Sequence, residues 1–338
     1  MKRVFCFTFL VLFLVNLSCS VDVFDERRVL MGTVVSISIY SQTEPPLWHT
    51  HVDSAFSRMA RLERLTTVYD STSQISGINR AAGMVSLEVD PEIVELLYLS
   101  KEVGEASNGA FDVTISPLLD VWRFHSDTPR VPALSEIQAH LGAIDFRKIS
   151  VSGSTATLAD AGMAIDLGGI AKGYAVDLAV DELLDDGYTD FMVEAGGDLR
   201  AVASDLTRGE RNIWIQHPRH PDKFFASIKM DAGAVATSGD YERYFEEGGK
   251  RYHHILNPQT GFPAGPNVSV TIFAGTTAIA DAYSTAVFVL GPEAGLQLIE
   301  QTPGLEGVII YEENSDGKLK WVATKNIKKK LKIIKDDK

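Results

Sequence analysis

The chain has 338 residues, 45% of them hydrophobic, which is enough for one large domain or two moderate ones with a substantial core. Its formal net charge of −13 argues against sequence-independent binding of nucleic acid, which needs a basic surface. Cys6 lies in a segment that we expect to be removed, so Cys19 is the only thiol of the mature chain. This excludes an intrachain disulfide, a cysteine–zinc site and a cysteine nucleophile in the folded body.

Residues 1–18 have the three parts of an export signal. Lys2 and Arg3 form a basic start, and the apolar run over residues 4–15 that follows is too short to span a bilayer. Ser18 before Cys19 resembles a bacterial lipoprotein processing site, although position 16 is Asn where an aliphatic residue is usual. We therefore expect a lipid on Cys19, a tether over residues 19–28, and a location on the inner membrane facing the periplasm. Plain secretion is the alternative.

The rest of the mature chain mixes strands and helices. Period-two and helical patterns predict strands at 34–40, 157–158, 164–167, 191–193, 213–215, 225–230 and 268–273, and helices at 51–65, from Pro91 through Val103, 170–184 and 278–290. The two kinds of element do not alternate regularly, which indicates an α+β fold with a large antiparallel or mixed sheet, in two lobes of one compact domain. The basic tail over residues 326–338 is expected to be solvated and frayed, with contact to an anionic membrane as the alternative.

The densest chemical pattern is the run over residues 166–177. A strand ends at Asp166-Leu167, two glycines follow at 168 and 169, and the next helix carries Lys172 in its first turn. Glycines let a backbone approach a ligand closely, the N–H groups at a helix start favour anions, and a lysine adds positive charge beside a phosphate. The spacing is neither a Walker A loop nor Gly-x-Gly-x-x-Gly. An ordinary strand-to-helix turn with an exposed lysine is the alternative.

Two further patterns each have an ordinary structural explanation. The turn Gly196-Gly197-Asp198 can form an anion-binding nest or a plain tight turn. Asp281 and Thr285 are four apart on a predicted helix, so their oxygens lie on one face and suit Mg²⁺. Alternatively, Asp281 favours the positive end of its helix and Thr285 bonds back to a carbonyl.

Two adjacent histidines precede an Asn-Pro turn. His253 and His254 point to opposite faces if they lie in a strand, which makes a shared zinc ion improbable. One of them as a proton-transfer group or ligand contact is the more plausible function, and an ordinary partly buried histidine is the alternative.

Taken together, short motifs of this chain resemble the ApbE family of flavin transferases. They occur in the family's order over about residues 29–291, and the set is far more specific than any member alone. The motifs are Met31-Gly32-Thr33, Gly109-Ala110-Phe111-Asp112 with Pro117 and Trp122, the run 166–177, Gly196-Gly197-Asp198, Thr237-Ser238-Gly239-Asp240, His254-Ile255-Leu256-Asn257-Pro258 with Thr260-Gly261, and Ala280-Asp281 with Thr285. The resemblance implies an ApbE-like (T-fold-like) flavin transferase domain over residues 29–325.

The resemblance also implies a reaction. FAD is the substrate and Mg²⁺ the cofactor, FMN is moved to a Thr or Ser hydroxyl of a membrane or periplasmic acceptor protein, and AMP is released. Some members also hydrolyse FAD to FMN and AMP. By motif, Asp281 and Thr285 bind the metal with backbone oxygens near Gly169 and Ser284. The expected FAD contacts are Met31, Tyr69, Ala110, Phe111, Asp112, Asp166, Lys172, Gly196, Gly197, His254 and Ile255. Asn257 stands where many members have Asp.

The transfer needs a base near the acceptor hydroxyl. His254 is the first candidate and Asp166 the second. No serine or cysteine nucleophile with an obvious base is present, which favours direct in-line transfer. Two other functions remain open: a flavin-binding lipoprotein without turnover, and a general metal-dependent nucleotide pyrophosphatase.

Overall fold

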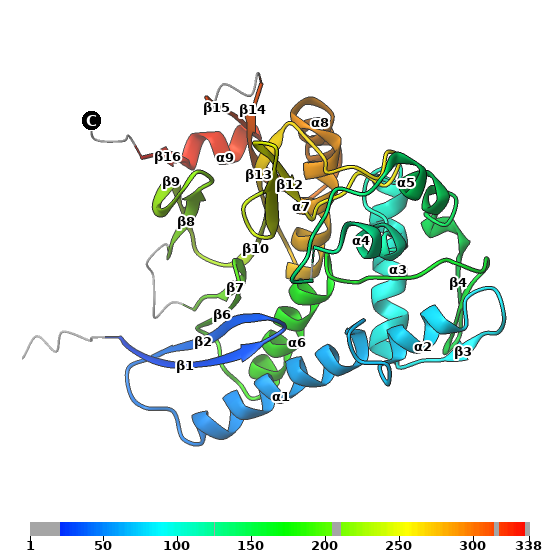
Figure 1. The fold of residues 1–338 in the computed structure, drawn as a ribbon. Helices are drawn as coiled ribbons and strands as arrows, with labels where there is room; N and C mark the ends of the chain where they lie inside the picture. The colour runs from blue at the N-terminus through cyan, green and yellow to red at the C-terminus, as the bar shows by residue number, and fades with distance from the viewer. Residues whose placement is uncertain (1–20, 125, 205–210, 314–317, 335–338) are drawn as a thin grey trace, which may run out of the picture.

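The computed structural model describes residues 21–124, 126–204, 211–313 and 318–334 (Figure 1). Its largest element within those residues is an eight-stranded sheet in which every neighbouring pair is antiparallel. In order across the sheet the strands are β1 (Asp22–Leu30), β2 (Thr33–Ser41), β6 (Phe191–Ala195), β7 (Asp198–Val202), β10 (Gly233–Gly239), β13 (Asn267–Ala274), β14 (Glu306–Glu312) and β15 (Leu319–Ala323).

The helices and three small sheets surround this large sheet. The helices are α1 (Trp48–Thr66), α2 (Gln74–Arg80), α3 (Pro91–Ala106), α4 (Ser116–Trp122), α5 (Leu134–Leu141), the 3₁₀ turn η1 (Phe146–Lys148), α6 (Ala171–Asp185), α7 (Thr277–Leu290), α8 (Pro292–Gln301) and α9 (Lys325–Lys330). The small sheets are β3 (Leu87–Glu88) with β5 (Thr155–Leu158) and β4 (Ile149–Ser152), β16 (Lys332–Ile333) with β9 (His220–Met230) and β8 (Arg211–His217), and β11 (Tyr244–Glu247) with β12 (Lys250–His253).

Both faces of the large sheet are covered. Along a strand successive side chains point to opposite faces, so Ala236 of β10 faces one core while Val235 faces the other. On the first face α1, α3, α6 and α7 pack into a single large core. On the second face the β16–β9–β8 sheet and α9 close a smaller core through Ile213, Ile228 and Ile327. All of these packing elements lie between residues 21 and 334.

A third core lies under the β11–β12 hairpin and is largely aromatic. Trp122, at the end of α4, is fully buried and packs against Phe124, Phe245, Tyr252 and Phe262. Its indole N–H donates to the carbonyl of Gly261 at 2.8 Å, which satisfies the one polar atom of the ring. This contact holds the turn that follows His254 against α4.

The predicted fold class is confirmed, and most predicted elements are present at their predicted places. The exception is the strand predicted at 164–167, where the structure has only one isolated bridge, from Ile115 to Ala164. The reason is local: the side-chain amide of Asn79 donates to the carbonyl of Ile165 and accepts from its N–H. Because that side chain satisfies the backbone, no neighbouring strand is required.

The predicted tether over residues 19–28 is wrong for most of its length. Residues 22–30 form β1, which pairs with β2 along all nine of its residues. The sequence pattern was weak because β1 is an edge strand with charged residues on both faces: Asp25 and Arg27 are exposed, and Glu26 and Arg28 are half-buried. The predicted signal peptide (1–18) and the lipid on Cys19 lie outside the described residues and stay predictions.

The predicted frayed tail (326–338) is also wrong as far as residue 334, and residues 335–338 lie outside the described residues. Residues 325–330 form α9, and β16 pairs with β9 through Lys332 and Ile333. The anchoring side chain is Ile327, which is only 7% exposed in the second core. One buried isoleucine between lysines carries too little periodicity to mark a helix, and this is why the pattern favoured a solvated end.

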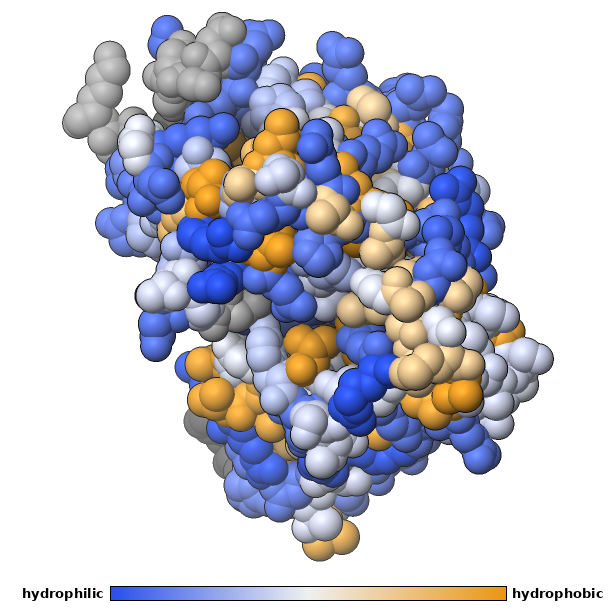
Figure 2. Space-filling model, turned by 45° about the vertical axis from the view of Figure 1, so that its right-hand side comes forward, coloured by the Kyte–Doolittle hydropathy of each residue, from blue (hydrophilic) through white to orange (hydrophobic). Residues whose placement is uncertain are grey.

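Hydrophilic residues cover most of the face in Figure 2, with apolar residues in small groups between them. None of the described helices is long and apolar enough to cross a bilayer.

We expect Ile327→Ala to lower the free energy of unfolding by about 2–5 kcal/mol, because it removes a buried side chain and leaves a cavity. Lys329→Ala, on the exposed side of the same helix, is the matched control and should change stability by less than about 0.5 kcal/mol. Urea denaturation of the two variants would measure both. Equal, small effects would contradict the folded tail.

Candidate functional site

Two tight hairpin turns lie next to each other at one end of the large sheet. Met31-Gly32 joins β1 to β2, and Gly196-Gly197 joins β6 to β7. All four residues have positive φ (52°, 71°, 55° and 94°), as in a type I′ turn. Because β2 pairs with β6, the turns are neighbours, and a Cβ on Gly196 would come within 2.6 Å of the Thr33 hydroxyl. The glycine there is therefore a steric requirement.

The structure decides between the two interpretations of the second turn. Gly196-Gly197 is an ordinary two-residue hairpin turn, and the N–H of Gly197 donates to the Glu194 carboxylate at 3.0 Å. The side chain of Glu194 therefore takes up the donor that an anion-binding nest would offer. Contact of these two glycines with FAD stays a prediction.

A buried charged group lies just behind this turn. Asp198, the first residue of β7, forms an ion pair with Lys172 of α6, and the lysine Nζ also donates to the carbonyl of Ala195 at 3.3 Å. Asp198 is 1% exposed and Asp281 of α7 is 6% exposed. Lys172 is therefore not the exposed lysine of the alternative interpretation; it reaches across to the β6–β7 hairpin.

The three charges perturb one another strongly. Burial raises the pKa of Asp198 well above its ordinary value, and the neighbouring Asp281 carboxylate raises it further. Burial also raises the pKa of Asp281, opposed by Lys172 and by the N–H of Gly173. Burial alone would lower the pKa of Lys172, but the two carboxylates outweigh it and raise it. Strong perturbation of several buried groups beside a glycine turn is typical of functional sites.

Asp281 is held by a close contact between α6 and α7. Its carboxylate accepts a hydrogen bond from the N–H of Gly173 at 3.1 Å. A Cβ on Gly173 would overlap the carbonyl oxygen of Thr277 and lie 2.8 Å from the Cβ of Asp281. One turn further along α6, Asp177 accepts from the N–H groups of Thr277 (2.9 Å) and Ala278 (2.8 Å), and so caps the start of α7.

Thr285 lies one turn beyond Asp281, as its spacing predicts. Gly169 is beside it, since a Cβ on that glycine would lie 3.4 Å from the Thr285 hydroxyl and 3.2 Å from the Phe111 ring. The Ser284 hydroxyl is already engaged, because it donates to the carbonyl of Asp281 at 2.8 Å and contacts Ser238 of β10 at 2.7 Å. Contact of the Ser284 backbone oxygen with a metal stays a prediction.

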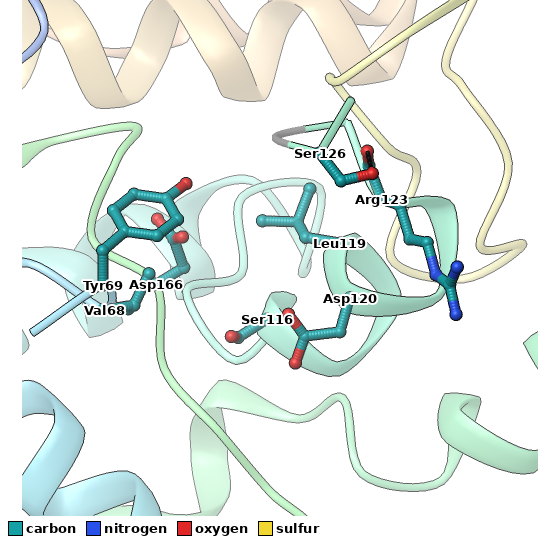
Figure 3. A pocket seen from close by; sticks show the side chains of 8 residues that line it. All are labelled: Val68, Tyr69, Ser116, Leu119, Asp120, Arg123, Ser126 and Asp166. Atoms are coloured by element: carbon teal, nitrogen blue, oxygen red, sulfur yellow. Dashed lines mark hydrogen bonds between the residues drawn. The ribbon is translucent and has the colours of Figure 1, made fainter. Parts of the chain in front are cut away.

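A cavity of about 220 Å³ lies between the loop after α1 and α4. Tyr69 and Asp166 lie together on one side of it, and Asp120 of α4 and Arg123, just after that helix, lie on the other (Figure 3). Asp166 also accepts from the N–H of Gly168 at 2.7 Å, which shapes the turn before α6. Partial burial and the Asp166 carboxylate raise the pKa of Tyr69, while Arg243 lowers it. Two predicted FAD contacts thus share one pocket.

The segment from Ala110 to Asp112 contributes its backbone and ring rather than a charge. The Asp112 carboxylate is turned inward and accepts from the Thr114 N–H (2.8 Å), the Thr114 hydroxyl (2.6 Å) and the Phe146 N–H (3.0 Å). Burial raises the pKa of Asp112 despite these bonds. The side chain supports the loop, so contact with FAD would come from the main chain or from Phe111.

The two adjacent histidines separate as expected. His253 is buried, with its ring against the carbonyl of Ala264 at 2.8 Å, and burial lowers its pKa. His254 points the other way, where its Nδ1 contacts the carbonyl of Arg243 at 3.2 Å. Ile255 is buried at 7% exposure. Of the pair, only His254 is accessible for proton transfer.

Several residues of this region were missed by the sequence analysis as site residues. Asp198 was quoted only as the end of a turn, and Asp177 only as the end of a motif. No sequence pattern marked Arg123 or Arg243. The Arg243 guanidinium would lie 3.6 Å from a Cβ on Gly32. For Asp198, an acid directly after a Gly-Gly hairpin was the one available signal.

The residues present fit a hard divalent cation. Two buried carboxylates share one lysine, and apart from that ion pair the oxygens of Asp198 have no hydrogen-bond partner among the described residues. The described chain contains no cluster of three or more His, Cys, Asp or Glu side chains able to hold a metal alone. One or two carboxylates plus oxygens of the substrate are the usual coordination of Mg²⁺.

We expect Gly173→Ala to destabilise the protein by about 1–3 kcal/mol, because the added methyl group must push α7 away from α6. In an ordinary helix interior Gly→Ala raises the free energy of unfolding, so a decrease at position 173 would indicate the close contact between the helices. Gly142→Ala, with open space around the site of the new methyl group, is the matched control. Thermal denaturation gives both values, and a stabilised Gly173→Ala protein would contradict the close contact.

Comparison with known proteins agrees with this geometry. The model of the ApbE family matches residues 31–309. The FAD:protein FMN transferase of Treponema pallidum is 31% identical over 307 residues, covering 86% of this chain and 85% of the relative. A solved ApbE protein of Thermotoga maritima superposes with a TM-score of 0.81 at 34% identity, over 91% of this chain and 99% of that one. The flavinyl transferase ApbE of Pseudomonas stutzeri superposes with a TM-score of 0.81 at 29% identity, over 92% of this chain and 97% of that one. This chain belongs to the ApbE family.

Proposed function

We propose that this protein is a Mg²⁺-dependent FAD:protein FMN transferase, which moves FMN from FAD to a Thr or Ser hydroxyl of an acceptor protein and releases AMP. The observation that carries the proposal is the convergence of Lys172, Asp198 and Asp281 beside two hairpin turns, next to Gly169 and Thr285. This is the chemistry needed for a pyrophosphate and its cation. The names of the family relatives support FAD as the nucleotide.

Each part of the site has a task in this reaction. Asp281 and Thr285 would hold Mg²⁺, which neutralises pyrophosphate charge and makes AMP a better leaving group. Lys172, fixed by Asp198, would lie beside a phosphate oxygen. Tyr69 and Asp166 in their shared cavity, with Phe111 nearby, would orient the ring systems of FAD.

The transfer itself is a single displacement. The acceptor oxygen forms a bond to the phosphorus on the FMN side, and the bond from that phosphorus to the bridging oxygen breaks. The bridging oxygen leaves with AMP. The hydroxyl proton passes to His254, our candidate base, with Asp166 as the second candidate.

The closest alternatives differ in what accepts FMN. With water as the acceptor the same site hydrolyses FAD to FMN and AMP. A flavin-binding protein without turnover would return intact FAD, and a general pyrophosphatase would also cleave NAD or ATP. The names of the family relatives, which are transferases, favour turnover over simple binding.

We further propose that the protein is exported and tethered to a membrane by a lipid on Cys19. This rests on the order of basic start, apolar run and cysteine in residues 1–19. The acceptor would then be a membrane or periplasmic protein.

Incubation of the protein with FAD, Mg²⁺ and an acceptor peptide should give AMP and a peptide whose mass has increased by FMN. Asp281→Asn should lower this rate at least about 100-fold, because it removes the negative charge of the proposed metal ligand and keeps the shape of the side chain. Mg²⁺ at about 100 times its Kd should raise the free energy of unfolding of the unmodified protein by about 2.7 kcal/mol, and should not stabilise the variant.

Asp160→Asn, on the exposed surface, is the control and should behave like the unmodified protein. Free FMN without modified peptide would indicate a hydrolase, and recovery of intact FAD would indicate a binding protein. Full activity of Asp281→Asn would refute the assigned metal site.

His254→Asn should lower the rate of FMN transfer by about 100-fold or more while FAD still binds, since a positioned base contributes that much to proton transfer. His49→Asn, an exposed histidine on α1, is the control. The transfer rate should be measured across pH. If His254 is the base, the rate of the unmodified protein falls at low pH as His254 becomes protonated, and the variant should lose this dependence. An unchanged profile would transfer the role to Asp166.

A further inference from the structure

We propose that the outer side of the β16–β9–β8 sheet, together with α9, docks onto an anionic lipid bilayer. This surface, called here the basic–aromatic face, consists of Trp214, Phe224, the three lysines 328–330, Lys332 and Ile334. It lies apart from the charged centre at Lys172 and is not used in the transfer reaction.

The charge of this face is opposite to that of the chain as a whole. Five lysines lie between residues 325 and 332, and there is no acid from 325 to 334, whereas the chain has a net charge of −13. All five are exposed, and none forms an ion pair with another described residue. The nearby Glu306 is occupied with Thr324 and Asn326. Lys328 lies 5.8 Å from the centroid of the Trp321 ring. Because no described acid neutralises these five lysines, they can attract anionic headgroups.

The same face exposes apolar side chains of the kind that enter a membrane interface. Trp214 is 50% exposed and Phe224 is 49% exposed, and their ring centroids are 5.0 Å apart. Ile334, at 40% exposure, is held in place by a backbone bond to Phe225. Trp and Phe beside lysines are typical of surfaces that lie in the headgroup region.

The strand register places the two kinds of side chain on one side. Trp214 is paired with Ser227, and Ser227 with Lys332, so the three form one row across the sheet. Residues opposite one another in an antiparallel sheet point to the same face. Ile213 and Ile228, on the opposite face, fill the second core. Lys332 and the Trp214–Phe224 pair therefore share one outer surface, and α9 with lysines 328–330 directly precedes β16 in the chain.

The arrangement favours a bilayer over a soluble polyanion. A nucleic acid would extend past this small face onto acidic surface, whereas a planar bilayer touches only one side of the protein. The described chain also enters β1 at the left of Figure 1, on the side where β8, β9 and β16 lie. A lipid on Cys19, three residues before β1, would bring this side to the membrane.

The test uses the unlipidated chain from Ser20 onward, which includes the whole described body. Sedimentation with phosphatidylcholine vesicles, with and without phosphatidylglycerol, should give binding only to the anionic vesicles, and high salt should weaken it. The triple variant K328Q/K329Q/K330Q should lower the partition coefficient at least about tenfold. The double variant W214S/F224S should lower it by about tenfold through lost apolar burial.

A control variant, R64Q/K148Q/K250Q, removes three positive charges from other parts of the surface and should bind as tightly as the unmodified chain. Circular dichroism confirms that each variant is folded. Equal loss in control and test variants would overturn the proposal, as would equal binding to zwitterionic vesicles. Binding to duplex DNA without binding to vesicles would overturn it in favour of a polyanion partner.

Discussion

The site depends on the close approach of α6 and α7. Gly173 allows the two helices to touch, and its N–H holds the Asp281 carboxylate. Asp177, on the same helix, caps the first N–H groups of α7 and pairs with Arg200 of β7 at 2.8 Å. The rotation and axial position of α7 are therefore fixed from α6, and with them the positions of Asp281 and Thr285. A larger residue at 173 would move both ligands together.

The antiparallel sheet brings the other parts to the same place. Hairpin turns recur at the ends of such a sheet, so Met31-Gly32 and Gly196-Gly197 become neighbours although they are far apart in sequence. The second hairpin starts β7 with Asp198, and the length of Lys172 spans the gap from α6 to that turn. Helix α7 thus carries the proposed metal ligands, α6 carries Lys172, and the β6–β7 hairpin carries the carboxylate that pairs with this lysine.

The sequence predicts those parts of the site that depend on residues close together in the chain, and does not predict contacts between residues far apart in it. Asp281 and Thr285 could be paired because helical spacing is local, and Lys172 could be placed in a first turn for the same reason. The partnership of Lys172 with Asp198 could not be predicted, since it depends on which strand the hairpin packs beside. At 164–167 the side chain of Asn79 replaces a strand partner, and at 327 one buried isoleucine orders a lysine-rich end. Both are tertiary contacts without a periodic signal.

The charge balance gives a reason why nucleotide and metal should bind together on the proposed function. A pyrophosphate must enter an acidic protein and approach two buried carboxylates that share only one lysine. Burial already disfavours both carboxylates in their charged form, so another anion there without a cation would be costly. A divalent ion that binds together with the phosphates would offset this conflict and would favour the charged form of Asp281. The metal-free site would then bind FAD weakly, because the repulsion that the ion neutralises is built into the contact between α6, α7 and the β6–β7 hairpin.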